Sequence, residues 1–133
     1  MTFGSLAAAD AWEQAAKASL TTPAREQVSW LLEVLGARFT AASLGIADAG
    51  ALRRWVDEKE NAPDHKEQHK LQLLYRMVFA IHGVYPEGSV AAGFLRSANP
   101  QLDDEAPLVL LASGDLGEVQ EPLLAAVRAF LEG

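Results

Sequence analysis

Apolar residues recur along most of this chain at intervals of three and four, the spacing that places them on one face of an α-helix. The longest stripe predicts a helix over residues 65–82 and consists of Leu71, Leu74, Tyr75, Val78, Ile81 and His82. A second stripe, with its first member at Val28, predicts a helix that runs from Ala24. Thr22 is the expected N-cap of this helix, Pro23 its first residue and Gly36 its end.

Shorter helices are predicted by the same spacing, by helix-forming residues and by glycine or proline at their ends. They cover residues 6–20, 40–44, 48–58, 89–97, 108–112 and 118–131. Asp48 is expected to cap the third of these, Gly83 to end the long central helix, and residues 101–106 to form a polar loop. No segment has a convincing strand pattern. The prediction is an all-α fold, a compact bundle of seven or eight short helices.

Composition limits the class of protein. The chain has 133 residues, of which 50% are hydrophobic and 22% charged, enough to bury the core of one domain. It has no cysteine, which excludes a disulfide scaffold, a thiol nucleophile and a cysteine-ligated metal. No basic leader and no apolar run of about 20 residues is visible, so we expect a soluble cytoplasmic protein.

Charge is distributed unevenly. The formal net charge is −7, which argues against a chain-wide coat of phosphate contacts. Residues 1–36 carry two basic and four acidic residues, residues 37–82 carry seven and six, and residues 83–133 carry two and eight, giving −2, +1 and −6. We therefore divide the chain into an N-terminal helical extension or dimerisation arm (1–36), a central region that tolerates anions (37–82) and an acidic C-terminal region (83–133).

Residues 40–55 have the pattern of a helix-turn-helix. A short helix with small residues meets a turn at Gly45, and Ile46, Leu52 and Trp55 are spaced to anchor a second helix on the core. DNA contact is predicted through residues 40–58 and their neighbours, with the candidates Arg38, Asp48, Ala49, Gly50, Arg53, Arg54 and Lys59. The alternative is a helix-turn-helix used for packing or protein binding, because the first turn of the second helix has no base-reading donor.

The segment Phe94–Gly114 carries an Asn-Pro-x-Leu loop followed by a proline and a leucine. The positions are Asn99, Pro100, Leu102, Pro107, Leu111 and Gly114. Together with the preceding helix-turn-helix, this pattern resembles the C-terminal domain of the Xre/MbcA/ParS-type antitoxins, over about residues 38–133. The chain departs from the family at Phe94, where tryptophan is usual, and at residues 103–105, Asp-Asp-Glu, where glycine and a basic residue are common.

The resemblance implies a small helical antitoxin that binds a RES-domain toxin, an enzyme that degrades or modifies NAD, and that represses its own operon. Asn99, Pro100, Leu102 and Pro107 are then scaffold positions. The toxin-binding candidates are Arg128, Phe130, Leu131, Glu132 and Gly133, where carboxylates could enter a cationic pocket. One alternative is an ordinary amphipathic last helix, and another is an orphan helix-turn-helix regulator without a toxin. A homodimer is expected.

Other candidate chemistry is sparse. His65 and His69 have the i, i+4 spacing of a zinc pair, but the sequence places no third strong ligand beside them. Ser113 lacks the preceding strand of a nucleophile elbow, and no glycine-rich phosphate loop occurs. Trp12, Trp30 and Trp55 are expected to anchor the core, with the alternative for Trp12 that its helix packs only on a partner chain. We therefore predict a protein that is not an enzyme and that uses neither metal nor cofactor.

Overall fold

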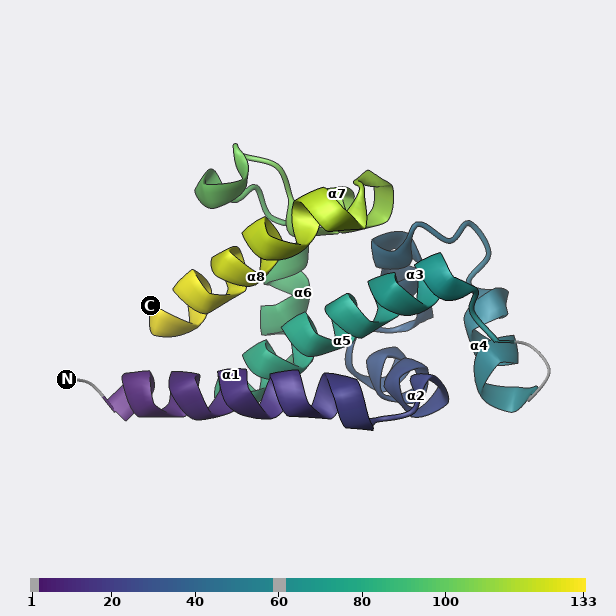
Figure 1. Ribbon diagram of the computed structural model, residues 1–133, viewed down its shortest axis with the longest axis horizontal. Coiled ribbons are helices and arrows are strands. Elements are labelled where there is room, and N and C mark those ends of the chain that lie inside the picture. Colours follow the sequence, from purple (N-terminus) through teal and green to yellow (C-terminus); the bar gives the residue numbers. More distant parts are fainter. Residues whose placement is uncertain (1–2, 59–61) are drawn as a thin grey trace.

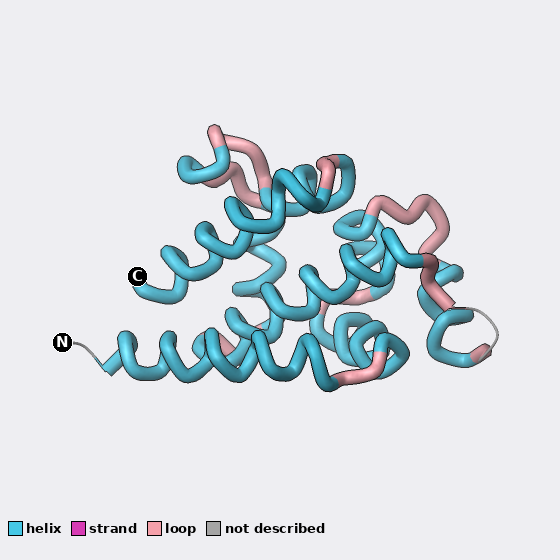
Figure 2. The backbone as a smooth tube through the Cα atoms, viewed as in Figure 1, coloured by secondary structure: helices cyan, strands magenta, loops and turns pink. Residues whose placement is uncertain are grey.

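The structure is a computed structural model that describes residues 3–58 and 62–133, with the side chains described from Leu6 onward. Eight α-helices and one 3₁₀ turn account for most of these residues, and none forms a strand, which confirms the all-α prediction (Figure 2). They are α1 (Phe3–Thr21), α2 (Ala24–Val34), α3 (Ala37–Leu44), α4 (Gly50–Asp57), α5 (His65–Val84), α6 (Gly88–Arg96), η1 (Pro100–Leu102), α7 (Pro107–Ser113) and α8 (Leu116–Glu132). No helix in the described part combines the length and apolarity needed to cross a membrane.

Helix α5 is the centre of the molecule. It runs between α1 and α8 and also contacts α2, α3, α6 and α7 (Figure 1). Its apolar stripe is almost fully buried, as the helical spacing predicts, and extends to a second row at Leu73 and Met77. A capping box fixes its start: the Glu67 amide donates to Asp64 Oδ1 at 2.8 Å, and the Asp64 amide donates to Glu67 Oε1 at 3.0 Å.

Helix α1 packs closely along α5 through small residues. Ala8, Ala11 and Ala15 are buried against the core, and Ala15 is completely inaccessible. A Cβ built at Gly83 would lie 3.0 Å from the Cβ of Ala11, so glycine here permits the close approach. Gly83 is therefore part of α5 rather than its end, which corrects the prediction from sequence. The small-residue face of α1 is covered within the chain, and buried apolar residues between Ala8 and Leu31 share one core with the rest.

We expect Ala15→Leu to lower the free energy of unfolding by about 2 kcal/mol, because a larger side chain has no space between α1 and α5. Ala9→Leu is the matched control, since Ala9 is exposed on the same helix and leucine is a good helix former. Urea unfolding measures both variants. Equal stability of the two would show that α1 does not depend on this close packing.

Several helix ends differ from those predicted. Pro23 has extended backbone angles and is the N-cap of α2, where its carbonyl accepts from the amides of Glu26 and Gln27. Thr22 makes no cap, and its Oγ1 instead lies 3.4 Å from the Tyr75 hydroxyl. Helix α3 begins at Ala37, three residues before the predicted start, and α8 begins at Leu116. The helix ends predicted from prolines and polar residues therefore lie within a few residues of the observed ones, which is usual for local sequence signals.

Candidate functional site

The corner between α3 and α4 contains the residues predicted to contact DNA. Gly45 ends α3 in the left-handed region with φ of 72°. The Ile46 amide donates to Ala41 O at 2.9 Å and the Gly45 amide donates to Ala42 O at 3.2 Å, which is the Schellman arrangement. The turn is thus closed by the glycine and apolar residue that the sequence indicated.

One backbone carbonyl joins this corner to the C-terminal region. A Cβ at Gly45 would meet Ala112 O at 2.7 Å, so α3 and α7 approach through bare backbone. The same oxygen accepts a hydrogen bond from Lys70 Nζ at 2.6 Å, across 42 residues of sequence. The α3–α4 corner, α5 and α7 therefore meet at the carbonyl of Ala112. This contact ties the position of α3 to that of α7.

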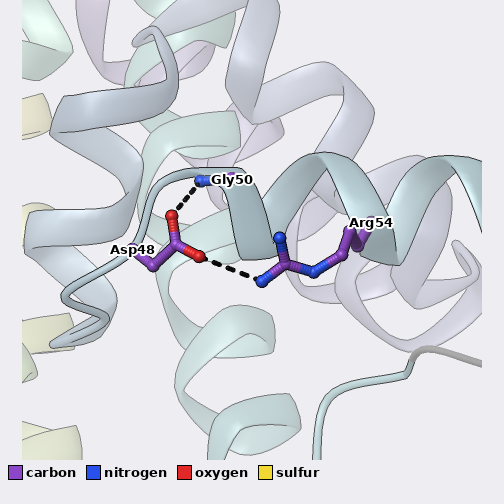
Figure 3. Close-up of polar contacts among 3 residues, drawn as sticks. All are labelled: Asp48, Gly50 and Arg54. Carbon is purple, nitrogen blue, oxygen red and sulfur yellow. Dashed lines mark hydrogen bonds and ion pairs between the residues drawn. The ribbon is translucent and has the colours of Figure 1, made fainter.

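Asp48 organises the start of α4 (Figure 3). Its Oδ1 accepts from the Gly50 amide at 2.9 Å and its Oδ2 accepts from Arg54 Nη2 at 3.0 Å. The hydrogen bond from Arg54 and then that from the Gly50 amide hold the pKa of Asp48 below its ordinary value. The stabilisation this gives is present above the ordinary carboxyl pKa and is lost as pH falls through the lowered one. The N-cap residue of α4 is Ala49, and Asp48 lies one residue before it. Asp48 therefore accepts a hydrogen bond from the first turn of α4, as predicted, but it is not itself the N-cap.

The candidate DNA-binding residues differ in their exposure and in the acidic side chains near them. Arg54 is paired with Asp48, although both are exposed. Arg53 is exposed and lines a shallow groove that also includes Glu33 and Asp57. Arg38 is exposed on α3, and Lys59 lies outside the described residues. The described part of the corner presents few cations, and acidic side chains lie beside both Arg53 and Arg54.

Arg25 lies outside the predicted helix-turn-helix but contacts α4, a role that was not predicted from the sequence. Arg25 on α2 donates through Nε to Val56 O at 2.9 Å and through Nη2 to the same carbonyl. These bonds satisfy a carbonyl in the last turn of α4, where a cation is favourable. A lone arginine early in α2 gives no local signal of this role, since its partner is 31 residues away.

The predicted toxin-binding residues form two groups at the end of α8. Leu131 is buried, and Phe130 packs on Phe94 with ring centroids 5.0 Å apart, so both hold α8 in place. Arg128 and Glu132 are exposed and form an ion pair with Nε and Oε2 3.6 Å apart. Gly133, the last residue, is also exposed and has a positive φ of 87°.

A groove of about 350 Å³ runs between this end of α8 and α1. It is lined by Ala8, Ala9, Trp12, Glu13, Arg128, Leu131 and Glu132. Trp12 is only partly buried, and the Arg128 guanidinium lies over its ring at 5.9 Å from the centroid. Sequence analysis placed Trp12 among core anchors, so its part in this surface is a finding of the structure. We call this the α1–α8 groove.

The loop that resembles the antitoxin pattern is a folded unit resting on α8. Asn99 Oδ1 accepts from the Gln101 amide at 2.9 Å, and the Asn99 amide donates to Glu105 O at 3.1 Å. Leu102 is buried, and η1 packs against α8. Pro107 opens α7. The predicted polar loop therefore contains a 3₁₀ turn and an isolated bridge between Asn99 and Glu105.

The acidic part of this loop has an unusual backbone. Asp103 and Asp104 have φ of 54° and 63°, in the left-handed region where glycine is favoured. Aspartate tolerates this region better than most residues, but two in succession with Glu105 next to them also gather negative charge.

We expect Asp104→Gly to raise the free energy of unfolding by about 0.5 kcal/mol, because relief of left-handed strain outweighs the extra entropy of the unfolded chain. Asp104→Ala should instead lower it by about 1 kcal/mol, since alanine is worse than aspartate in this conformation. The urea midpoint at constant m-value measures both. If Asp104→Gly were less stable than the unaltered chain, the Asp104 carboxylate would stabilise the fold by more than its left-handed backbone destabilises it.

The remaining candidates are two histidines, a serine and two tryptophans. The rings of His65 and His69 lie 6.1 Å apart, and nowhere in the described residues do three metal-ligating side chains gather. Ser113 Oγ donates to Val109 O at 2.7 Å within its own helix. Trp55 is buried, and Trp30 packs on Tyr75, Phe79 and His82.

Comparisons of the chain with protein-family models, with curated proteins and with solved structures find no match.

Proposed function

We propose that this chain is an antitoxin-like protein that binds and neutralises a RES-type toxin. The observation that carries the proposal is the folded Asn99–Pro107 loop, seated on α8 and joined through α7 to the α3–α4 corner. The residues that resemble the antitoxin pattern serve as scaffold there, as the resemblance implies. We further propose that the protein acts in the cytoplasm, as a homodimer and without enzymatic activity of its own.

The α1–α8 groove is the surface best suited to a protein partner. Arg128 and Glu132 remain exposed beside the partly buried ring of Trp12, so the groove offers charges of both signs and an aromatic surface. Aromatic and arginine side chains dominate the energetics of many interfaces. We propose that the exposed carboxylate of Glu132 enters a cationic pocket of the toxin.

Co-expression with a RES-type toxin, sought in the reading frames next to this chain's gene, tests the proposal. A tagged copy of this chain should retain the toxin through size-exclusion chromatography at physiological salt. A toxin that elutes separately when both proteins are folded would overturn the proposal.

A second function, repression of an operon through DNA contact, is favoured by the Schellman turn at Gly45 and by exposed Arg38 and Arg53. If no toxin is found, the alternative is an orphan regulator that uses the same corner. Because few cations face outward, we propose phosphate contacts rather than base reading, and binding by a dimer.

We expect Arg53→Ala combined with Arg54→Ala to weaken binding to the upstream DNA and to reduce the salt slope by about 2, one for each lost phosphate contact. Binding measured at two salt concentrations gives the slope. Arg96→Ala, on α6, is the control that changes charge away from the corner. An unchanged slope in the double variant would remove this corner from DNA binding.

A further inference from the structure

A cleft of about 320 Å³ lies where α1, α5 and α8 meet. Figure 1 shows α1 and α8 on either side of α5, and all three helices contact one another. Polar groups converge on the cleft from each helix, namely Ser19 of α1, His69, Gln72 and Arg76 of α5, and Gln120 of α8. No acidic side chain of the described residues lines it.

Arg76 is the unusual member of this set. Its Nε is buried and has no hydrogen-bond partner in the described part of the chain. Its guanidinium lies over the ring of Trp12, 5.3 Å from the centroid, and no ion pair among the described residues includes it. A buried donor without an acceptor is unfavourable, and more so when the group is charged.

The electrostatic surroundings favour an anion. Trp12 is shared by the guanidinium groups of Arg76 and Arg128, but only Arg128 has an ion-pair partner, Glu132. The guanidinium of Arg76 therefore has no ion-pair partner among the described residues. A cation in a concave site with low-dielectric walls attracts small anions from solution.

The cleft is also held in shape before any ligand arrives. Gln72 Nε2 donates to Ser19 O at 2.9 Å, and buried Gln27 donates to the same carbonyl at 3.1 Å. Ser19 Oγ donates to Ala16 O at 2.8 Å. Preformed polar walls reduce the cost of binding, because few side chains need to be ordered.

We propose that this cleft binds a phosphate or carboxylate group, with Arg76 as its main cation and the side chains of Gln72, Gln120 and His69 as neighbouring donors. The planar guanidinium fork matches both oxyanions. The site lies beyond the proposed toxin surface, because the cleft and the α1–α8 groove share no lining residue.

Nuclear magnetic resonance tests the site, since a buried arginine Nε–H and the Trp12 indole N–H give resolved signals. We expect inorganic phosphate, and in a separate arm succinate, to shift both signals saturably with a dissociation constant of about 1 mM or below. Sodium chloride at matched ionic strength is the reference. A response to one anion alone identifies the oxyanion, and a response to both identifies a site for the shared chemistry.

Three variants locate the response. Arg76→Gln should abolish the saturable shift of the Trp12 signal, and Arg76→Lys should weaken it by keeping the charge while losing the fork. Arg96→Gln, exposed at the end of α6, should leave it unchanged. The proposal is overturned if neither anion gives a saturable shift in the unaltered chain, if sodium chloride gives the same shift, or if folded Arg76→Gln responds like the unaltered chain.

Discussion

Replacing Gly45 by alanine lowers the free energy of unfolding by about 3 kcal/mol. Two effects add: the residue has φ of 72°, and a Cβ would lie 2.7 Å from the backbone oxygen of Ala112. A backbone carbonyl cannot rotate away as a side chain can, and this one is held by Lys70. Thermal and urea unfolding measure the loss.

Two other glycines separate these effects. Gly36 also has a positive φ, 88°, but a Cβ there meets nothing within 4 Å, so Gly36→Ala should lose only about 1 kcal/mol. Gly93 lies inside α6 with open space around it, and Gly93→Ala should gain about 0.5 kcal/mol from helix propensity. If Gly45→Ala lost no more than Gly36→Ala, the close approach of α3 to α7 would be disproved.

If the chain binds a toxin as proposed, we expect Glu132→Lys to reduce the affinity for it by at least about tenfold and to leave the fold intact. Glu132 is exposed, and its ion pair with Arg128 is of the surface kind that contributes little to stability. A lysine there would face the cationic pocket that we propose for the toxin, and like charges across an interface are strongly unfavourable. Isothermal titration with the toxin measures the affinity, and a thermal melt checks the fold.

Glu121→Lys is the matched control for this reversal. It makes the same charge change at an exposed position of α8, 11 residues earlier and about 16 Å along the helix. We expect it to keep the affinity of the unaltered chain. Equal affinities of the two variants would place the toxin away from the end of α8.

Local pattern predicted most of this fold because the helices are amphipathic. The stripe of α5 lies in the core as its spacing indicates, and Gly45 closes the turn for the conformational reason its sequence context suggests. Gly83 misled the prediction, because it looks like a helix end but allows Ala11 to approach α5. Glycine is found both at the ends of helices and where two helices pack closely, so the sequence alone does not separate the two roles.

The candidate sites were less predictable, because their contacts join residues far apart in sequence. Lys70 reaches Ala112, and Arg25 reaches Val56. Arg76 lies on α5, yet nothing near it in sequence shows that its guanidinium packs on the ring of Trp12 or that no described carboxylate pairs with it. The exposed residues Arg128 and Glu132 were among those predicted from the sequence. The groove that they form with α1 was not predicted, because only the fold brings α1 and α8 together.

The most direct test of the proposed function is a titration of NAD degradation. A purified RES-type toxin would be assayed for NAD loss with increasing amounts of this chain. We predict that NAD loss falls in proportion to the chain added and stops once every toxin molecule is bound. Undiminished NAD loss in the presence of a large molar excess of folded chain would contradict the assignment.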